Sequence, residues 1–217
     1  MPDRAPAGHP VVKMCGMVRP EDAAAAVRLG VSYLGVIFAG GPRQVTVAQA
    51  REVVAAAGGV PVLGVFGSAT GDEILRVREQ AGLAGAQLHE RGTPDLLARL
   101  RAAGLFVLPV LRLRGVEDFP ELDELRATGA PVLVEPRVEG KLGGSGVPLP
   151  LELAAAARAR LGAHPLVLAG GLTPETVAAA VAAVQPHGVD VSSGIEQSPG
   201  VKDPQRMLRF MEAVGWR

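Results

Sequence analysis

The stretch VVKMCGMVRPEDAAAA, from Val11 to Ala26, is an apolar run followed by a turn and an alanine-rich segment. A short run of β-branched residues is typical of a buried strand, and Pro20 stands where the first turn of a helix tolerates proline. The stretch therefore predicts a strand, a turn and a helix. It also holds Cys15, the only cysteine among the 217 residues, at the end of the predicted strand.

The same pattern of strand and helix recurs along the chain. Eight apolar runs predict strands at residues 11–15, 33–38, 60–66, 85–89, 105–111, 131–135, 165–170 and 188–194. The segments between and after them predict helices near residues 20–29, 46–57, 71–81, 94–103, 117–127, 149–161, 174–184 and 203–213. Three of these helices have a proline preceded by a good N-cap residue, namely Thr93, Thr173 and Asp203.

Strict alternation of strands and helices predicts a parallel sheet covered by helices. An open doubly wound sheet is one arrangement, but its edge strands are usually more polar than any run found here. Two very small domains would also fit the length, yet no linker-like stretch divides the chain. We therefore predict a single (β/α)8 TIM barrel over residues 11–217, preceded by a loose tail at residues 1–10.

Composition and charge argue against several classes of protein. The 22 basic and 22 acidic residues cancel, which leaves no electrostatic footprint for nucleic acid or an anionic membrane. No apolar stretch reaches the ~18 residues of a membrane span, and the first ten residues lack the apolar core of a signal peptide. A single cysteine permits no internal disulfide and no cysteine cluster, and no metal-ligand spacing occurs. We expect a cytoplasmic protein without a metal ion.

The active site of such a barrel lies at the carboxyl ends of its strands. Polar or glycine residues close several predicted strands: Cys15, His89, Glu135, Gly170, Gly171, Ser192, Ser193 and Gly194. Because side chains alternate along a strand, three strands carry a second polar residue on the same face. The pairs are Lys13 with Cys15, Gln87 with His89, and Asp190 with Ser192. We expect these faces to converge on one pocket.

Cys15 has two interpretations. Most lone cysteines are small buried hydrophobic residues. Alternatively, Lys13 lies two residues away on the same face, and its positive charge would favour the thiolate over the thiol. Cys15 could then accept a proton near neutral pH.

Three glycine-rich loops predict a phosphate site. LAGGLTPETV (168–177) offers backbone amides and a helix N-terminus, and VDVSSGIEQSPGVKD (189–203) offers hydroxyls, amides and room for a short extra helix. GKLGGSG (140–146), which contains Gly143 and Gly144, would close the other side. Plain turns and a flexible linker are the alternatives. The loops after strands seven and eight often bind phosphate in these barrels, so we predict a phosphate ligand.

Three further polar residues have competing interpretations. Glu135 is either a rim residue paired with Arg137 or a general acid whose pKa is raised by burial. Arg43, after the second strand, is either solvated or binds a substrate carboxylate. His89 is either a hydrogen-bonding partner of the substrate or merely a strand-end residue.

The chain resembles the phosphoribosylanthranilate isomerase family of tryptophan biosynthesis, from Val12 to about Phe210. The segments that carry the resemblance are VKMCGMVRPEDA, GVIFAGGPRQV, GAQLHE, GGSG, LAGGLTPETV and VDVSSGIEQSPGVKD, in the order and spacing of the family. Thiamine-phosphate synthase and indoleglycerol-phosphate synthase share the barrel and the phosphate loops, but not the cysteine motif. The resemblance implies a cofactor-free Amadori rearrangement of N-(5-phosphoribosyl)anthranilate to 1-(2-carboxyphenylamino)-1-deoxyribulose 5-phosphate.

The resemblance also implies roles for individual residues. Cys15 matches the general base of the family, Arg43 matches the arginine that meets the anthranilate side, and the glycine and serine loops match the phosphate site. Glu135 stands where the family has an aspartate as general acid, and VPLPLEL (147–153) replaces a phenylalanine-aspartate-tryptophan segment. The expected partner is a small phosphosugar–anthranilate molecule, and the expected state is a monomer or homodimer. An isomerase for a related aminoaldose phosphate and a non-catalytic phospho-ligand binder are the alternatives.

Overall fold

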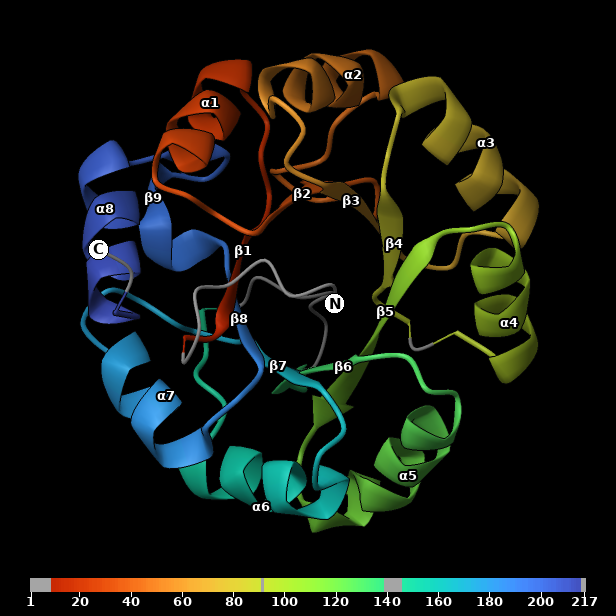
Figure 1. Cartoon of the computed structure of the whole chain (residues 1–217), viewed down its shortest axis with the longest axis vertical. Helices are drawn as coiled ribbons and strands as arrows, with labels where there is room; N and C mark the ends of the chain where they lie inside the picture. The colour runs from red at the N-terminus through yellow and green to blue at the C-terminus, as the bar shows by residue number, and fades with distance from the viewer. Residues whose placement is uncertain (1–8, 91, 139–145, 216–217) are drawn as a thin grey trace.

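The computed structural model describes residues 9–90, 92–138 and 146–215. In this part of the chain eight parallel strands close into a barrel, in which each strand pairs with the next and β8 pairs with β1 (Figure 1). The strands are β1 (Val11–Met14), β2 (Tyr33–Ile37), β3 (Val62–Phe66), β4 (Gly85–Leu88), β5 (Phe106–Leu113), β6 (Val132–Pro136), β7 (Leu166–Leu168) and β8 (Gly188–Val191).

The helices form a ring around the barrel (Figure 1). They are α1 (Pro20–Arg28), α2 (Val47–Ala56), α3 (Gly71–Ala81), α4 (Pro94–Ala102), α5 (Phe119–Ala127), α6 (Leu151–Leu161), α7 (Val177–Val184) and α8 (Pro204–Ala213), and a 3-10 turn, η1 (Val116–Asp118), precedes α5. The predicted (β/α)8 barrel is therefore confirmed. Of the predicted tail at residues 1–10, residues 1–8 lie outside the described residues.

Threonine and aspartate side chains cap several helices as the sequence predicts. The Thr93 hydroxyl accepts a hydrogen bond from the backbone of Leu96, and the Asp203 carboxylate accepts two from the first turn of α8. These caps satisfy backbone donors that the helix itself leaves without partners.

The predicted start of α7 is wrong by three residues. Thr173 and Thr176 hold a turn instead, since Oγ1 of Thr173 accepts from the backbone of Glu175 and Oγ1 of Thr176 accepts from the backbone of Thr173. Local bonds of this kind compete with helical ones. The helix therefore begins at Val177.

The stretch after β8 also differs from the prediction. The expected short extra helix is only a 3-10 turn, η2 (Ser193–Ile195). It is followed by an antiparallel pair, β9 (Glu196–Ser198) and β10 (Val201–Lys202), with Gly200 at a φ of 83° between them. The missed signal is the Pro199-Gly200 dipeptide, which marks a turn.

Two apolar layers fill the fold. Alternate strand residues such as Val12, Leu34 and Val36 pack outward under the helices. The others, among them Val11 and Leu133, fill the inside of the barrel. Because this inner layer closes the barrel below, the strand ends above it are free to form a site.

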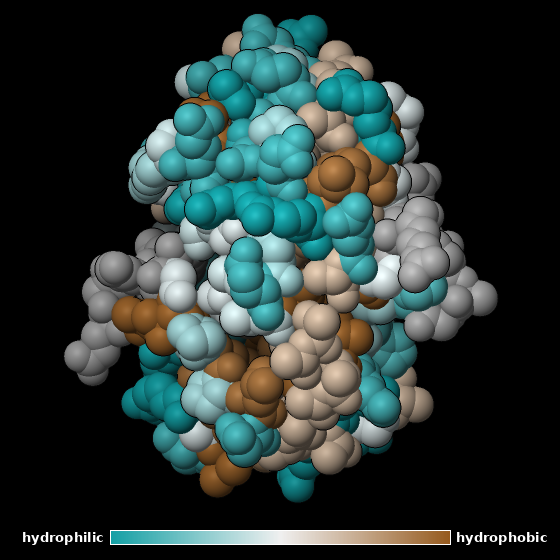
Figure 2. Space-filling model, turned by 90° about the vertical axis from the view of Figure 1, so that its left-hand side faces the viewer, coloured by the Kyte–Doolittle hydropathy of each residue, from teal (hydrophilic) through white to brown (hydrophobic). Residues whose placement is uncertain are grey.

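One side of the surface is mixed in polarity. Figure 2 shows hydrophilic residues over its upper half and apolar residues gathered lower down, at the height of α7 in Figure 1. This fits the sequence of α7, VAAAVAAV. Among the described residues, no helix has both the length and the apolar character to cross a membrane.

Candidate active site

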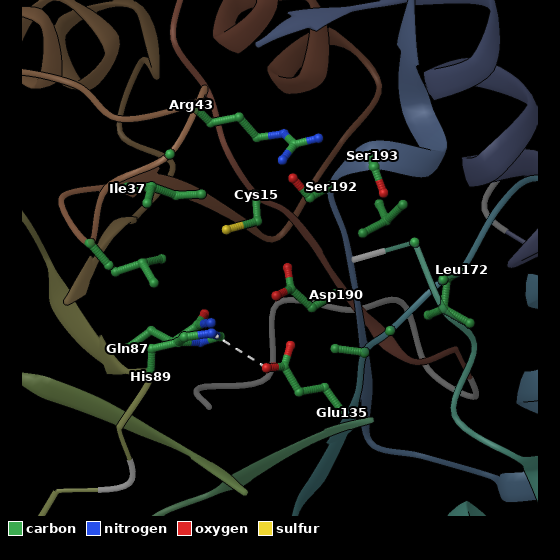
Figure 3. Close-up of a pocket in the computed structure, with 18 of the residues that line it drawn as sticks. Cys15, Ile37, Arg43, Gln87, His89, Glu135, Leu172, Asp190, Ser192 and Ser193 are labelled. Carbon is green, nitrogen blue, oxygen red and sulfur yellow. Dashed lines mark ion pairs between the residues drawn. The ribbon is translucent and has the colours of Figure 1, made fainter. Parts of the chain in front are cut away.

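A cavity of about 580 Å³ opens at the carboxyl ends of the strands (Figure 3). It brings together residues from strands that are far apart in sequence. The sequence-predicted residues that line it are Cys15, Arg43, Gln87, His89, Glu135, Gly170, Gly171, Asp190, Ser192 and Ser193. Lys13 lies beneath it and Gly194 beside it, while Gly143 and Gly144 lie outside the described residues.

Cys15 follows β1 and borders the cavity, although the residue is only 5% exposed. The neighbouring strand makes room for its thiol by means of Gly35. A Cβ atom on Gly35 would lie 2.7 Å from Sγ of Cys15 and 3.1 Å from Nζ of Lys13. A side chain at this position would therefore displace the thiol.

Lys13 and Asp190 form a buried ion pair directly beneath the thiol. They are register partners on β1 and β8, and Nζ of Lys13 lies 3.0 Å from each carboxylate oxygen of Asp190. Lys13 is wholly buried, so this pairing compensates a charge that would otherwise be very costly. The positive charge of Lys13 is thus shared between Asp190 and the thiol.

This sharing corrects the expectation that Lys13 makes Cys15 a ready thiolate. Burial raises the pKa of Cys15 and outweighs the lowering by Lys13, and the negative charge of Asp190 raises the pKa further. The neutral thiol is therefore favoured. Lys13 opposes this shift but does not reverse it.

Glu135 is a buried carboxyl group whose protonation is balanced near neutral pH. Burial is the main cause that raises its pKa to about 7, and the charge of Asp190 adds to the effect. Nε2 of His89 lies 3.5 Å from its Oε1. Among the described residues no ion pair joins Glu135 to Arg137, so it is not the paired rim residue of the first interpretation.

The glycine loops pack closely against one another beside the cavity. Gly171 has a φ of 62°, and a Cβ there would lie 2.6 Å from the backbone of Pro148. A Cβ on Gly194 would clash with the carbonyl group of Leu172. Because glycine permits both approaches, the loops after β6, β7 and β8 meet at one place.

A second cavity adjoins these loops. It is lined by Gly171, Ser193 and Gly194 together with Arg206 and Arg209 of α8. Sequence reasoning did not select these arginines. The two arginines outnumber the carboxylate of Glu175, which lines the same cavity, so the balance of charge beside the glycine-rich loops favours an anionic ligand.

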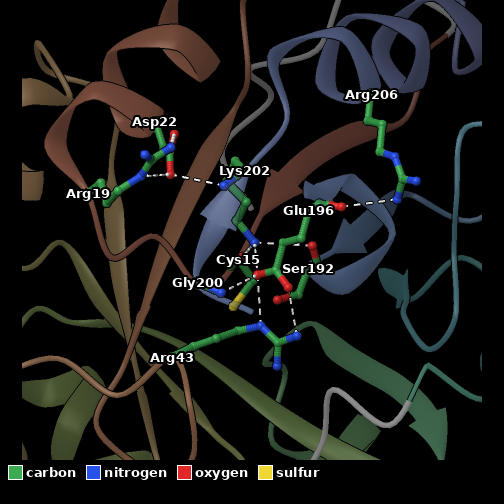
Figure 4. Close-up of polar contacts among 9 residues, drawn as sticks. All are labelled: Cys15, Arg19, Asp22, Arg43, Ser192, Glu196, Gly200, Lys202 and Arg206. Atoms are coloured by element: carbon green, nitrogen blue, oxygen red, sulfur yellow. Dashed lines mark hydrogen bonds and ion pairs between the residues drawn. The ribbon is translucent and has the colours of Figure 1, made fainter. Parts of the chain in front are cut away.

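Arg43 reaches the cavity from the loop after β2, but its guanidinium group is largely occupied. Nε and Nη2 donate to Oε1 and Oε2 of Glu196 at 2.8 and 2.7 Å (Figure 4). Nη1 makes no hydrogen bond to the described residues and remains for a ligand. Sequence reasoning missed Glu196 and its neighbour Lys202.

Within residues 9–90, 92–138 and 146–215, no group of three or more histidine, cysteine, aspartate or glutamate side chains is placed to hold a metal ion. What the cavity offers is a thiol and a protonatable carboxyl group. β7 and β8 separate the strands that carry them, and in Figure 3 Asp190 lies between the two.

A closed (β/α)8 barrel with a protonatable carboxyl group, a thiol and glycine-rich loops at one mouth is typical of a class, namely barrel enzymes that perform acid–base chemistry on phosphorylated substrates. The chain belongs to the N-(5'-phosphoribosyl)anthranilate isomerase family, whose model matches residues 12–213.

Individual relatives agree with this assignment. The N-(5'-phosphoribosyl)anthranilate isomerase of Rubrobacter xylanophilus is 40% identical over 211 residues, which cover 94% of this chain and 98% of the relative. The solved phosphoribosyl anthranilate isomerase of Thermotoga maritima is 28% identical, with a TM-score of 0.85 and coverage of 95% and 98%. Another solved isomerase, in complex with reduced 1-(o-carboxyphenylamino)-1-deoxyribulose 5-phosphate, is 28% identical with a TM-score of 0.82 and the same coverage.

Proposed function

We propose that this chain converts N-(5'-phosphoribosyl)anthranilate to 1-(2-carboxyphenylamino)-1-deoxyribulose 5-phosphate in tryptophan biosynthesis. The observation that carries the proposal is the placement of Cys15 and Glu135 at one cavity beside the glycine loops. The family supports it, and the complexed relative binds a reduced form of this product.

Glu135 acts as the general acid in this proposal. A carboxyl group with a pKa of about 7 is substantially protonated near neutral pH and can give its proton to the furanose ring oxygen. The C1'–O bond then breaks, and the nitrogen lone pair forms the iminium of a Schiff base. The iminium is the electron sink, so the residues of the chain have only protons to move.

Cys15 acts as the general base. Its thiolate removes the proton from C2', the C–H electron pair forms the enolamine, and tautomerisation gives the ketone. Burial favours the thiol form, but a cationic iminium beside the sulfur lowers the pKa of a thiol. The substrate intermediate itself thus favours the form of Cys15 that accepts the proton.

The remaining polar groups bind the two ends of the substrate. Gly170, Gly171, Ser193 and Gly194 hold the phosphate group through backbone amides and a hydroxyl, and Gly143 and Gly144 are assigned to the same end. Nη1 of Arg43 binds the anthranilate carboxylate.

The sugar lies between these two ends. Oε1 of Gln87 and Oγ of Ser192 are buried without a hydrogen-bond partner in the described part of the chain, so sugar hydroxyl groups would satisfy them. Ser192, which the sequence predicts at the phosphate, is thus assigned to the sugar. His89 adds a polar group on the same side as Gln87, and Asp190 lies between the acid and the base. We assign the enzyme to the cytoplasm, as a monomer or homodimer that requires no cofactor.

Turnover of N-(5'-phosphoribosyl)anthranilate by the purified protein tests the proposal. The fluorescence of the anthranilate adduct reports its consumption, and Cys15→Ser should lower turnover by several orders of magnitude while inorganic phosphate still binds. Binding of the reduced product without any turnover would overturn the proposal and favour a phospho-ligand-binding protein. Turnover of another aminoaldose phosphate alone would assign a different substrate.

A further inference from the structure

The hairpin of β9 and β10 places two charged side chains behind the cavity. Glu196 is 6% exposed and Lys202 is 1% exposed, and neither lines the cavity itself. They are register partners, and Nζ of Lys202 lies 2.9 Å from Oε1 of Glu196. Burying an ion pair often yields little net stability, so their location calls for another reason.

Glu196 holds the arginine of the cavity. Both of its carboxylate oxygens accept from Arg43 in a bidentate geometry, and Oε1 also accepts from the backbone of Gly200 (Figure 4). This fixes the plane of the guanidinium group, and with it the direction of Nη1.

Lys202 holds the ends of two strands. Besides Glu196, its Nζ donates to the carbonyl oxygens of Cys15, at 2.6 Å, and of Ser192, at 3.1 Å. Cys15 follows β1 and Ser192 follows β8, and the side chains of both line the cavity. The ammonium group therefore fixes the backbone that carries the thiol.

The outer end of the same network is anchored to α1. The backbone N–H of Lys202 donates to Oδ2 of Asp22, and Arg19 holds both oxygens of this buried carboxylate. The hairpin is thus tied to the first helix as well as to the first and eighth strands. Its position follows from long-range contacts rather than from its own short ladder.

We propose that Glu196 and Lys202 are positioning residues: Glu196 aims Arg43 at the substrate, and Lys202 sets the position of the Cys15 thiol. The roles of Arg43 and Cys15 in this statement rest on the proposed function. The position of the thiol does not, because the reactivity of a single cysteine can be measured without any substrate.

The thiol is surrounded by several charges. Lys13 of β1, Asp190 of β8, Lys202 of β10 and Arg43 of the β2 loop lie closest, and Glu135 lies across the cavity. Of these groups, Lys202 both binds the Cys15 backbone and lowers the pKa of its thiol. Removing its charge should therefore move the thiol and raise the pH at which it reacts.

Alkylation of Cys15 by iodoacetamide across a pH series tests the role of Lys202. We expect Lys202→Met to raise the midpoint of the alkylation profile and to lower kcat at least tenfold. Asp118→Asn is the matched control: it removes a buried carboxylate that accepts from the backbone of Arg114, away from the cavity. It should leave the profile and kcat unchanged. An unchanged profile in folded Lys202→Met overturns this role.

Steady-state kinetics test the role of Glu196. We expect Glu196→Gln to raise KM for phosphoribosylanthranilate at least tenfold, with kcat changed less than threefold and inhibition by inorganic phosphate unchanged. If kcat and phosphate binding fall as much as KM rises, the positioning role of Glu196 is overturned, because such losses would indicate general damage to the barrel.

If Lys202→Met does not fold, the double variant Glu196→Gln/Lys202→Met replaces it, since no buried carboxylate is then left without its lysine. It should fold and still show the raised alkylation midpoint, and a midpoint like that of the native chain overturns the role of Lys202. Absence of turnover in the native chain would instead overturn the proposed function, while the alkylation experiment would still decide this inference.

Discussion

Nε2 of His89 lies 3.5 Å from Oε1 of Glu135, and both side chains are almost completely buried. β4 and β6 bring them together across the end of β5. The separation is longer than a normal hydrogen bond, so His89 does not hold the carboxyl group tightly in its charged form. Burial can then dominate, and the pKa of Glu135 rises to about 7.

The raised pKa makes the stability of the protein depend on pH. In the unfolded chain Glu135 titrates near 4.5, so between about pH 4.5 and 7 the folded state binds the additional proton. The stabilisation that comes from this proton is fully present below pH 4.5 and is lost as the pH rises through 7. The loss in the free energy of unfolding amounts to about 3 kcal/mol.

We therefore expect Glu135→Gln to gain stability relative to the native chain above pH 7 and not below pH 4.5. Urea unfolding of both proteins at pH 4.5 and pH 8 gives this difference directly. A difference in the free energy of unfolding that is the same at both pH values would contradict the assignment.

Glu135 and Cys15 together should set the pH dependence of the rate. If protonated Glu135 donates a proton and the Cys15 thiolate accepts one, kcat/KM rises with pH up to about pH 7 and then levels off, because the loss of protonated Glu135 offsets the growing thiolate fraction of Cys15, whose pKa is raised. Glu135→Asp withdraws the carboxyl group by one methylene and should lower kcat about 10- to 100-fold, because a displacement near 1 Å has an effect of this size. A pH–rate profile of each protein is the measurement. A faster Glu135→Asp enzyme would show that glutamate is tolerated here rather than preferred.

Much of this arrangement follows from the sequence because the barrel obeys simple rules. Apolar runs placed the eight strands, and closure of the barrel brings their ends together, so Cys15, Glu135 and Asp190 could be selected from their positions alone. The caps at Thr93 and Asp203 were predictable because their hydrogen bonds span two or three residues.

Other features depend on contacts that no local pattern encodes. Arg43 and Glu196 are 153 residues apart, so their pairing could not be inferred from either segment. The pKa of Cys15 depends on how deeply the thiol is buried, which spacing from Lys13 does not reveal. The start of α7 depends on a choice between two local hydrogen-bond patterns, and Thr173 adopts the turn.

Gly194 should control the phosphate end of the cavity. A Cβ at this position would clash with the carbonyl group of Leu172, so Gly194→Ala forces the loops after β7 and β8 apart. We expect the inhibition constant of inorganic phosphate and the KM for the substrate to rise at least tenfold. The alkylation rate of Cys15 should stay unchanged because the thiol lies on another strand. Unchanged phosphate inhibition in the folded variant would place the phosphate elsewhere.

Gly35 should control the position of the thiol. It is part of β2, and a methyl group there would lie within contact of Sγ of Cys15 and Nζ of Lys13, as close as 2.7 Å to the sulfur. Real Cβ atoms do not approach other atoms so closely, so Gly35→Ala must displace the thiol or the strand. A displacement near 1 Å costs about 100-fold in rate, and we expect kcat to fall by at least this factor while phosphate inhibition is retained.

Gly67→Ala is the matched control for Gly35→Ala. Gly67 follows β3 and does not line the cavity, and its added Cβ would make only an ordinary contact of 3.6 Å with Ala39. This variant should keep the native kcat. Both proteins are compared by circular dichroism, by thermal unfolding and by the rate of iodoacetamide alkylation. Gly35→Ala could instead fold with native kcat and a native alkylation rate. The space above Gly35 would then not be what holds the sulfur in its reactive position. The assignment of Cys15 as the base would lose its geometric support.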